Sequence, residues 1–321
     1  MKIGIDVMGG DHAPEAVVSG AVLASRELSA SEKIVLIGDK DQATSIIKSK
    51  GGDPSVFEFV HTADVIGMAE HPTKAFSQKP NASIPLGFKM LKEKNIDVFS
   101  SCGNTGAMLV GCMFTIKTIP GIIRPCITSV LPKFKGGSGV LLDVGANADC
   151  KPDVLYQFGV LGSLYLQHVY GMKDPRVGLL NIGEEEEKGN LVSQSAHALM
   201  KGSKDFNFVG NVEGNDIFGD HADVVVCDGF NGNVVLKTCE SFYHMMKKRG
   251  IKDEYFDRFN YESYGGLPVM GINSNVIIGH GISNEAAVKN MILLCKNVTE
   301  AKLAERVKEA FVQFVSPSYS G

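Results

Sequence analysis

The sequence predicts an α/β protein in which helices cover both faces of a mostly parallel, open sheet. Short aliphatic runs alternate with longer stretches of helical periodicity along the whole chain, a pattern typical of βαβ units. Apolar runs such as Asp223–Cys227 (DVVVC) are continuous, as in strands that are buried on both faces. Glycine-rich turns follow many of these runs. Together the three observations favour an α/β/α sandwich.

Ten short segments are expected to be strands, because they are rich in aliphatic and aromatic residues and are bounded by turn residues. They are 2–7, 33–37, 56–60, 97–100, 127–131, 140–142, 177–180, 206–209, 223–227 and 276–278. Helical spacing of apolar residues predicts helices at 14–28, 41–50, 83–94, 105–116, 154–170, 190–201 and 233–249. The segment 284–314 is also helical in its spacing, with a break expected near Asn297–Thr299.

A chain of 321 residues is long enough for two domains of about 150 residues, or for one α/β unit that carries a sub-domain. We expect the second arrangement, with a single α/β domain over residues 1–315. A small, irregular helical protrusion is expected at about 240–271, since 250–271 mixes Lys, Asp, Tyr and Gly without a clear period. The last residues, 316–321 (SPSYSG), are expected to form a flexible tail.

Composition excludes several classes of protein. With 44% apolar and 21% charged residues the chain can bury a large core, so it is not disordered as a whole. A net charge of −4 and a pI near 6.1 lack the basic excess of a nucleic-acid binder. No uncharged apolar run reaches the roughly 18 residues of a membrane span, and Asp6 interrupts the position of a signal-peptide core. Seven cysteines without a C-x-x-C pair indicate reduced thiols in a cytoplasmic protein.

Six of the expected strands run into polar, glycine-rich loops. These loops are Met8–Asp11, Cys102–Ala107, Val144–Asn147, Ile182–Glu185, Asn211–Asn215 and Gly229–Asn233. Ligands of open parallel sheets bind beyond the carboxyl ends of the strands, so we expect the six loops to line one polar cleft. Glycine lets backbone N–H groups approach a ligand, helix N-termini attract anions, and Lys188 is a nearby cation. The expected ligand is a phosphate or another oxyanion.

The signatures of other chemistries are absent from the sequence. It contains no G-x-x-x-x-G-K-[ST], no G-x-G-x-x-G after the first strand, no G-x-S-x-G and no H-E-x-x-H. Four aspartates could hold Mg²⁺, namely Asp6, Asp11, Asp143 and Asp228. Without a nucleotide motif we favour the alternative, in which they cap loops and orient hydrogen-bond donors. We likewise expect Cys150 to be structural, and His12 and His280 to be hydrogen-bonded loop residues rather than general acids.

Six motifs, in this order, resemble those of the bacterial phosphate acyltransferases (acyl-ACP:phosphate acyltransferases, the PlsX family). They are D-x-M-G-G-D at 6–11, C-G-N-T-G-A at 102–107, L-D-V-G-A-N-A-D-C at 142–150, P-R-V-G-L-L-N-I-G at 175–183, K-G-N at 188–190 and D-G-F-x-G-N at 228–233. The motifs span nearly the whole chain, and such a set is difficult to match by chance.

The resemblance implies that the protein moves a long-chain fatty acyl group from acyl carrier protein to inorganic phosphate, giving acyl phosphate for phospholipid biosynthesis. It also implies a fold similar to that of phosphotransacetylase and isocitrate dehydrogenase, a homodimer, and a reaction without metal or cofactor. The expected location is the cytoplasm, in loose contact with the inner face of the cell membrane. A membrane glycerol-3-phosphate acyltransferase would then be the downstream partner.

On this hypothesis Lys188 and Asn233 are the catalytic residues. Lys188 would offset the charge of phosphate, and Asn233 would polarise the thioester carbonyl. Phosphate is itself an anionic nucleophile, so we expect direct attack without an acyl-enzyme. The expected phosphate- or substrate-binding residues are Gly9, Gly10, Asp11, Asn104, Thr105, Gly106, Asn147, Asn181, Asp228 and Gly232. The alternative for Lys188 is a solvent-exposed lysine that offsets the acidic run Glu184–Glu187.

Three positions, in two segments, depart from the family pattern. The family commonly has Arg at the position of Ser77 and a second Lys at that of Pro80. If those side chains touch carrier protein or phosphate in relatives, then either Lys79 suffices here or basic residues elsewhere compensate. Cys102 stands where the family usually has a smaller residue, and we expect it to be a packing residue.

The segment Phe242–Met246 places apolar side chains directly before the basic triplet Lys247–Arg249. It could contact an anionic membrane surface or the acidic acyl carrier protein, or it could form a dimer contact. Two other functions stay open. One is a phosphotransacetylase-like acyl-CoA:phosphate acyltransferase, and the other is a non-enzymatic scaffold that binds acyl carrier protein and lipid.

Overall fold

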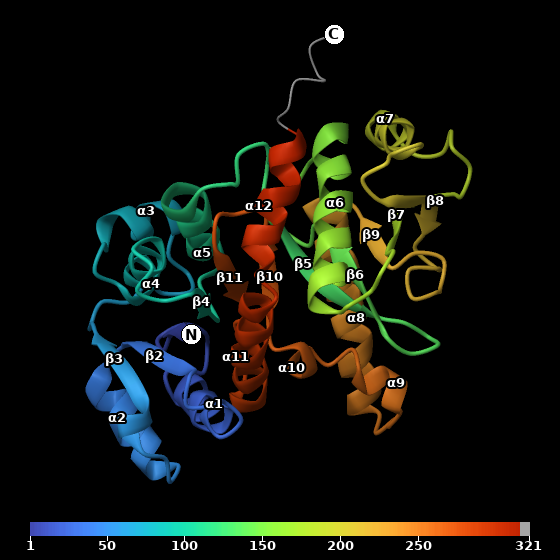
Figure 1. Cartoon of the computed structure of the whole chain (residues 1–321). Coiled ribbons are helices and arrows are strands. Elements are labelled where there is room, and N and C mark those ends of the chain that lie inside the picture. Colours follow the sequence, from blue (N-terminus) through green and yellow to red (C-terminus); the bar gives the residue numbers. More distant parts are fainter. Residues whose placement is uncertain (315–321) are drawn as a thin grey trace. The chain divides into compact units, whose positions relative to one another are not determined.

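A computed structural model describes residues 1–314 and divides into two compact units (Figure 1). The first unit contains residues 1–118 and 261–302. The second contains residues 119–260 and the C-terminal segment that begins at Leu303. That the two units act as the single domain expected from the sequence stays a prediction. The expected tail, 316–321, lies outside the described residues.

The sheet of the first unit has the strand order β3-β2-β1-β4-β11-β10. The strands are β1 (Lys2–Asp6), β2 (Lys33–Gly38), β3 (Phe57–His61), β4 (Val98–Ser101), β10 (Leu267–Met270) and β11 (Asn275–Ile278). Neighbouring strands are parallel except for the antiparallel pair β10 and β11. The loops that follow β1, β4 and β11 therefore emerge at one edge of the sheet.

Helices cover both faces of this sheet. Phe99 and Ser100 are consecutive residues of β4, so their side chains point to opposite faces. The ring of Phe99 lies against Gly87 of α4 (Ser83–Lys92), whereas Ser100 lies beside Cys295 of α11 (Glu285–Glu300). Helix α1 (Glu15–Ser25) packs on α11 (Figure 1). The remaining helical elements are α2 (Lys40–Ser49), the turn Pro54–Val56, α3 (Pro72–Gln78), α5 (Thr105–Gly111), the π-helical turn Cys112–Ile116 and α10 (Tyr261–Tyr264).

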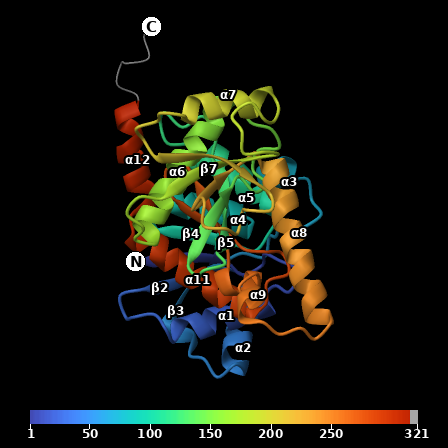
Figure 2. The same ribbon diagram turned by 90° about the vertical axis from the view of Figure 1, so that its right-hand side faces the viewer.

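The sheet of the second unit has the order β5-β6-β9-β7-β8. Its strands are β5 (Cys126–Pro132), β6 (Ser138–Leu142), β7 (Arg176–Asn181), β8 (Asn207–Glu213) and β9 (Val224–Val226). The helices of this unit are α6 (Pro152–Val169), α7 (Leu191–Met200), α8 (Gly229–Lys248), α9 (Glu254–Asp257) and α12 (Leu303–Phe314). Strand β5 is antiparallel to β6, and the other neighbours are parallel. The loops after β6, β9 and β7 thus share one edge of this sheet, and α8 is a single long helix (Figure 2).

The predicted fold class is confirmed, and all ten expected strands overlap observed ones. Strand β10 was not expected because it contains Pro268, and proline removes a backbone donor and is rare inside sheets. Helix α8 begins at Gly229, four residues before the expected start, because Asp228 caps it by accepting the N–H of Asn231 at 2.8 Å. The C-terminal helical segment breaks at residues 301–302, slightly beyond the expected break.

The segment expected to be irregular, 240–271, contains the second half of α8, the short helices α9 and α10, and β10. Aromatic rings hold α9 within the second unit, since Tyr255 stacks on Phe134 at 5.1 Å and Phe259 meets Phe218 at 5.0 Å. Across residues 1–314, none of the helices has the length and hydrophobicity that a bilayer crossing requires.

Candidate active site

The twelve residues predicted to form the site fall into two clusters, one in each unit. The first cluster follows β1 and β4, and it consists of Gly9, Gly10, Asp11, Asn104, Thr105 and Gly106. The second cluster follows β6, β7 and β9, and it consists of Asn147, Asn181, Lys188, Asp228, Gly232 and Asn233. Each cluster lies at the carboxyl edge of its own sheet, where open α/β sheets bind ligands.

Asp6 organises the loop after β1. Its buried carboxylate accepts the N–H of Met8 at 2.9 Å and the hydroxyl of Ser101 at 2.7 Å. Burial raises the pKa of Asp6 above its ordinary value, although the hydrogen bonds favour the charged form and oppose part of that rise. The loop continues through Gly10, whose φ of +100° favours glycine. Asp11 is exposed, and its N–H donates to the carbonyl of Gly281 at 2.7 Å.

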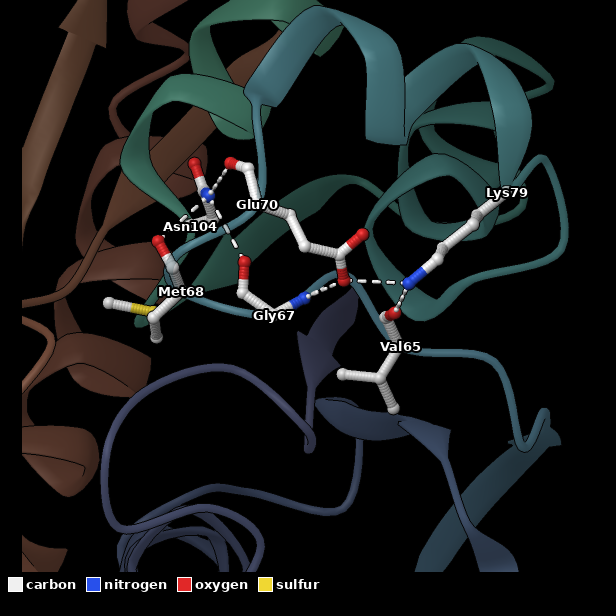
Figure 3. Close-up of polar contacts among 6 residues, drawn as sticks. All are labelled: Val65, Gly67, Met68, Glu70, Lys79 and Asn104. Atoms are coloured by element: carbon white, nitrogen blue, oxygen red, sulfur yellow. Dashed lines mark hydrogen bonds and ion pairs between the residues drawn. The ribbon is translucent and has the colours of Figure 1, made fainter.

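Asn104 holds the loop after β4. Its side-chain oxygen caps α5 by accepting the N–H of Ala107 at 3.1 Å. Its amide nitrogen faces the carbonyls of Gly67, Met68 and Glu70 (Figure 3). The buried Asn104 side chain therefore joins two loops of the protein. Thr105 is exposed at the start of α5, and Gly106 packs against Pro72.

Asp143 sets the conformation of the loop after β6. This fully buried carboxylate accepts five N–H groups: those of Ile127 (2.9 Å), Gly145 (3.3 Å) and Ala146 (3.1 Å), and the backbone (2.7 Å) and side-chain (2.8 Å) N–H groups of Asn147. The amide of Asn147 also donates to the carbonyl of Pro125 at 2.8 Å. Asn147 is thus a buried part of the loop framework, whereas Gly145 is exposed.

The start of α8 packs directly on this loop. The N–H of Gly229 donates to the carbonyl of Asn147 at 2.7 Å. A Cβ atom on Gly232 would overlap the carbonyl oxygen of Asp143, so only glycine fits at that position. Asn233 is exposed on the first turn, and its amide donates to the carbonyl of Val144 at 3.1 Å. That hydrogen bond uses one of the two amide N–H groups and fixes the direction of the amide.

Lys188 lies in the loop between β7 and α7, and its side chain is 46% exposed. Its ammonium nitrogen is 3.9 Å from the carboxylate of Glu185, whereas Glu186 pairs with Lys201. Two asparagines position the loop: Asn181 donates to the carbonyl of Lys188 at 3.2 Å, and the buried Asn211 donates to that of Glu185 at 2.8 Å. The loop therefore presents Lys188 to solvent on a defined backbone.

Three of the four aspartates considered as metal ligands accept hydrogen bonds from the protein, and the fourth, Asp11, is exposed. Asp6 and Asp143 accept donors from their own loops, and Asp228 caps α8. Within residues 1–314, no three His, Cys, Asp or Glu side chains gather in a group that could hold a metal ion. A reaction without metal stays a prediction.

The cysteines near the site are protonated at neutral pH. Burial raises the pKa of Cys102 to about 12 and, together with nearby acidic groups, raises that of Cys150 to about 12. A thiolate nucleophile is therefore not available at either position.

The charge of Lys79, one of the two alternatives considered for the missing cations at Ser77 and Pro80, is paired. Its ammonium group donates to the carbonyl of Val65 at 2.8 Å and to the carboxylate of Glu70 at 2.6 Å (Figure 3). Its charge is thus paired inside the first unit. The idea that Lys79 compensates for Ser77 and Pro80 has no support in this geometry.

Sequence analysis missed several residues that hold the loops in place. Ser101 is a polar residue at the end of an apolar strand, and that position could have indicated it, whereas Asn211 stands in one of the loops that were expected to line the cleft. Met68 carries no such signal in the sequence, because Asn104, which donates to its carbonyl, is 36 residues away and Gly281 is farther still.

Solved structures define the class of fold. A phosphotransacetylase from Streptococcus pyogenes superimposes with a TM-score of 0.66 at 17% identity, covering 95% of this chain and 94% of that one. A branched-chain phosphotransacylase from Enterococcus faecalis gives a TM-score of 0.64 at 12% identity, covering 93% and 99%. At such identities the likeness shows the fold alone, which is the α/β fold of the phosphotransacetylases.

Sequence comparison then gives the family. The sequence model of a family described as "Fatty acid synthesis protein" matches residues 1–306. A phosphate acyltransferase of Syntrophomonas wolfei is 42% identical over 96% of this chain and 99% of its own length, and one of Acetivibrio thermocellus is 40% identical over 97% of each. The chain belongs to this phosphate acyltransferase family. The resemblance seen in the sequence and the prediction of an acyltransferase enzyme are confirmed.

Proposed function

We propose that the protein transfers a long-chain fatty acyl group from acyl carrier protein to inorganic phosphate, releasing acyl phosphate and free carrier thiol. Membership of the phosphate acyltransferase family supports acyl transfer to phosphate. The observation that carries the proposal is the exposed Lys188 on a loop positioned by Asn181 and Asn211. Strands β6, β9 and β7 of the second unit are parallel neighbours, so the loop that carries Lys188 and the loops after β6 and β9 lie at the same edge of its sheet.

The proposed chemistry is a direct displacement. A phosphate oxygen attacks the thioester carbonyl carbon, a C–O bond forms, the C–S bond breaks, and the departing sulfur takes a proton to become the carrier thiol. Phosphate is anionic at neutral pH, so no strong general base is needed. Lys188 offsets the charge of phosphate, and the amide of Asn233 donates to the oxyanion that develops on the carbonyl. The hydrogen bond to Val144 supports this role because it orients the amide before substrate binds.

The other predicted site residues divide by what they contact. Gly9, Gly10, Asp11 and Thr105 belong to loops of the first unit, where Asp11 and Thr105 are exposed, and Gly232 lies against the carbonyl of Asp143 in the second unit. We assign substrate contacts to these residues and to Gly106. The side chain of Asn104 bonds to a neighbouring loop, and those of Asn147, Asn181 and Asp228 bond within their own loops, so we assign all four to positioning.

We further propose that the protein acts in the cytoplasm as a homodimer and touches the inner membrane surface. The end of α8 supports membrane contact, since Phe242 is 57% and Met245 48% exposed directly before Lys247–Arg249. The acyl phosphate would there reach a membrane glycerol-3-phosphate acyltransferase for phospholipid synthesis. Reversing the charge of Lys247, Lys248 and Arg249 should abolish sedimentation with anionic liposomes. Unchanged sedimentation would remove the membrane proposal and leave a contact with acyl carrier protein or with a second copy of the chain.

The reaction is tested with palmitoyl-acyl carrier protein, with and without inorganic phosphate, by following the free carrier thiol. We expect release that requires phosphate and is insensitive to a chelator. Palmitoyl-CoA in place of the carrier distinguishes a phosphotransacetylase-like enzyme, which would accept it as well. Equal release without phosphate would indicate a thioesterase, and binding without release would indicate a scaffold. Either result would overturn the proposal.

A further inference from the structure

Arg124 lies at the same edge of the second unit's sheet as the loops that carry Lys188 and Asn233. It stands two residues before β5, which is antiparallel to β6, so the start of β5 lies at the carboxyl end of β6. The N–H of Val144 donates to the carbonyl of Ile127 in β5 at 3.1 Å, and the carbonyl of Val144 accepts the amide of Asn233. Arg124 is three residues before Ile127, or roughly 10 Å of extended chain. Arg124 and Asn233 therefore flank the loop after β6 within a single unit.

Two amide side chains fix the backbone on either side of Arg124. On one side, Gln157 of α6 accepts the N–H of Ile123 at 2.9 Å. On the other side, Asn147 donates to the carbonyl of Pro125 at 2.8 Å, and Asn147 is itself held by the buried carboxylate in the loop after β6. The position of the Arg124 backbone is therefore defined before any ligand binds.

The side chain of Arg124 is exposed. Within residues 1–314 its guanidinium group makes one hydrogen bond, to the carbonyl of Asp149 at 3.4 Å, and no ion pair. A guanidinium group carries five N–H donors, so four of them have no partner in that part of the chain. Its charge also reaches Cys150: burial and nearby carboxylates raise the pKa of that thiol, and Arg124 opposes part of the rise. Arg124 is therefore an available anion-binding group at the edge of the site.

The sheet separates Arg124 from Lys188. Strands β6 and β9 lie between β5 and β7, so β5 and β7 are about three strand spacings, or roughly 14 Å, apart. This separation favours a different anion for each of the two cations. The acyl donor offers a second anion besides inorganic phosphate, because the phosphopantetheine arm of acyl carrier protein carries a phosphodiester at the end opposite the thioester.

We propose that Arg124 is a substrate-binding residue that holds the phosphodiester of this arm. The inference rests on the proposed function, in which the thioester carbonyl lies at Asn233. From the thioester sulfur to the phosphodiester the arm is about as long as four residues of extended chain, roughly 14 Å, so it can reach from Asn233 to Arg124. The planar guanidinium group donates two parallel N–H groups to phosphate oxygens, a geometry that a lysine does not provide.

The test measures the affinity of the protein for two forms of acyl carrier protein that differ only in the arm. The holo-carrier has phosphopantetheine on its serine, and the apo-carrier has the unmodified serine. We expect the wild type to bind the holo-carrier more tightly. Arg124→Gln should weaken binding of the holo-carrier by about tenfold, because a charge-assisted contact is lost, and should leave binding of the apo-carrier unchanged. Arg124→Lys keeps the charge without the paired donors, so its affinity for the holo-carrier should fall between the two.

Lys173→Gln is the matched control, since it removes the same charge from the same unit. Lys173 is exposed and precedes β7, so it lies at the amino edge of the sheet, away from the site. This substitution should change neither affinity. Unfolding of Arg124→Gln in urea should match that of the wild type, because the side chain makes one long hydrogen bond to the protein. A loss of binding by Arg124→Gln is then a loss of contact with the arm.

The outcomes separate this inference from the proposed reaction. Equal weakening of holo- and apo-carrier binding by Arg124→Gln would indicate a contact with carboxylates of the carrier protein and would overturn the inference. Unchanged binding of both forms, or a wild type that does not prefer the holo-carrier, would overturn it as well, even if the wild type transfers acyl groups to phosphate. Selective weakening of holo-carrier binding supports it, even if the wild type releases no thiol and the proposed reaction fails.

Discussion

Asp143 and Asn147 are joined by two hydrogen bonds to a single carboxylate oxygen. This oxygen accepts the backbone N–H of Asn147 at 2.7 Å and its side-chain N–H at 2.8 Å. The other oxygen accepts three backbone N–H groups, and the first turn of α8 packs on the same loop through Gly229 and Gly232. One buried charge therefore sets two of the loops at the edge of the second sheet.

Asp143→Asn tests this role. An amide must turn its own N–H groups toward some of the five donors, which leaves buried N–H groups without acceptors at a cost of about 1–3 kcal/mol each. We expect the free energy of unfolding, measured with urea, to fall by about 3 kcal/mol or more. Asp149→Asn, in an exposed residue of the same loop region, is the control. Equal losses in the two variants would contradict the role of Asp143.

Asn233→Ala removes the proposed donor to the oxyanion. Loss of one such donor typically lowers turnover by about 10²–10³-fold, or about 2.7–4 kcal/mol. We expect that loss in kcat, with little change in the KM for phosphate. The control is Asn231→Ala, because the amide of Asn231 is bonded back to Asp228 at 2.9–3.0 Å. Near-normal turnover of Asn233→Ala would exclude Asn233 as the donor.

The buried Asp6 predicts a pH dependence of stability. Desolvation raises its pKa in the folded protein above the ordinary value of 3.8, so the native state takes up the proton first as pH falls. This group contributes stability below pH 3.8 and loses that contribution as pH rises through its folded-state pKa. Relative to Asp6→Asn, the wild type should therefore become less stable as pH rises through that window. Urea midpoints of both proteins from pH 4 upward measure it, and a constant difference contradicts the expectation.

The reaction should proceed without a cysteine nucleophile. Burial keeps Cys102 and Cys150 protonated at neutral pH, with each pKa raised to about 12. We expect Cys150→Ala to retain full turnover. When enzyme is mixed with palmitoyl-acyl carrier protein, intact-protein mass spectrometry of the enzyme should detect no acyl adduct. A stable acyl adduct on either cysteine would show a two-step route instead.

The arrangement of the sheet could be predicted because the strands are apolar runs bounded by glycine-rich turns. Local patterns also placed the predicted site residues at the carboxyl ends of the strands. The roles of the asparagines could not be predicted in the same way. Asn104 and Asn147 occur in turns that could bind a ligand, but tertiary contacts direct their amides to backbone carbonyls of the protein. Such contacts depend on residues distant in sequence and leave no periodic signal.

The same limit applies to charge. The sequence does not distinguish the roles of two lysines. Lys79 lies in a segment where the family commonly has basic residues, and Lys188 directly follows an acidic run. In the structure the ammonium group of Lys79 is 2.6 Å from the carboxylate of Glu70, whereas that of Lys188 is 3.9 Å from the carboxylate of Glu185. Coulomb attraction over such distances depends on the fold, so only the folded arrangement distinguishes the structural lysine from the catalytic candidate.

The most direct measurement is a phosphate titration of carrier-thiol release from palmitoyl-acyl carrier protein, made with the wild type, Lys188→Gln and Lys201→Gln. Lys201 is the control, since it pairs with Glu186 close to the same loop. The account predicts saturable, phosphate-dependent release by the wild type and Lys201→Gln, and a KM for phosphate at least about tenfold higher for Lys188→Gln, because a charge-assisted contact is lost. Release that is independent of phosphate, or identical titrations for all three proteins, would contradict it.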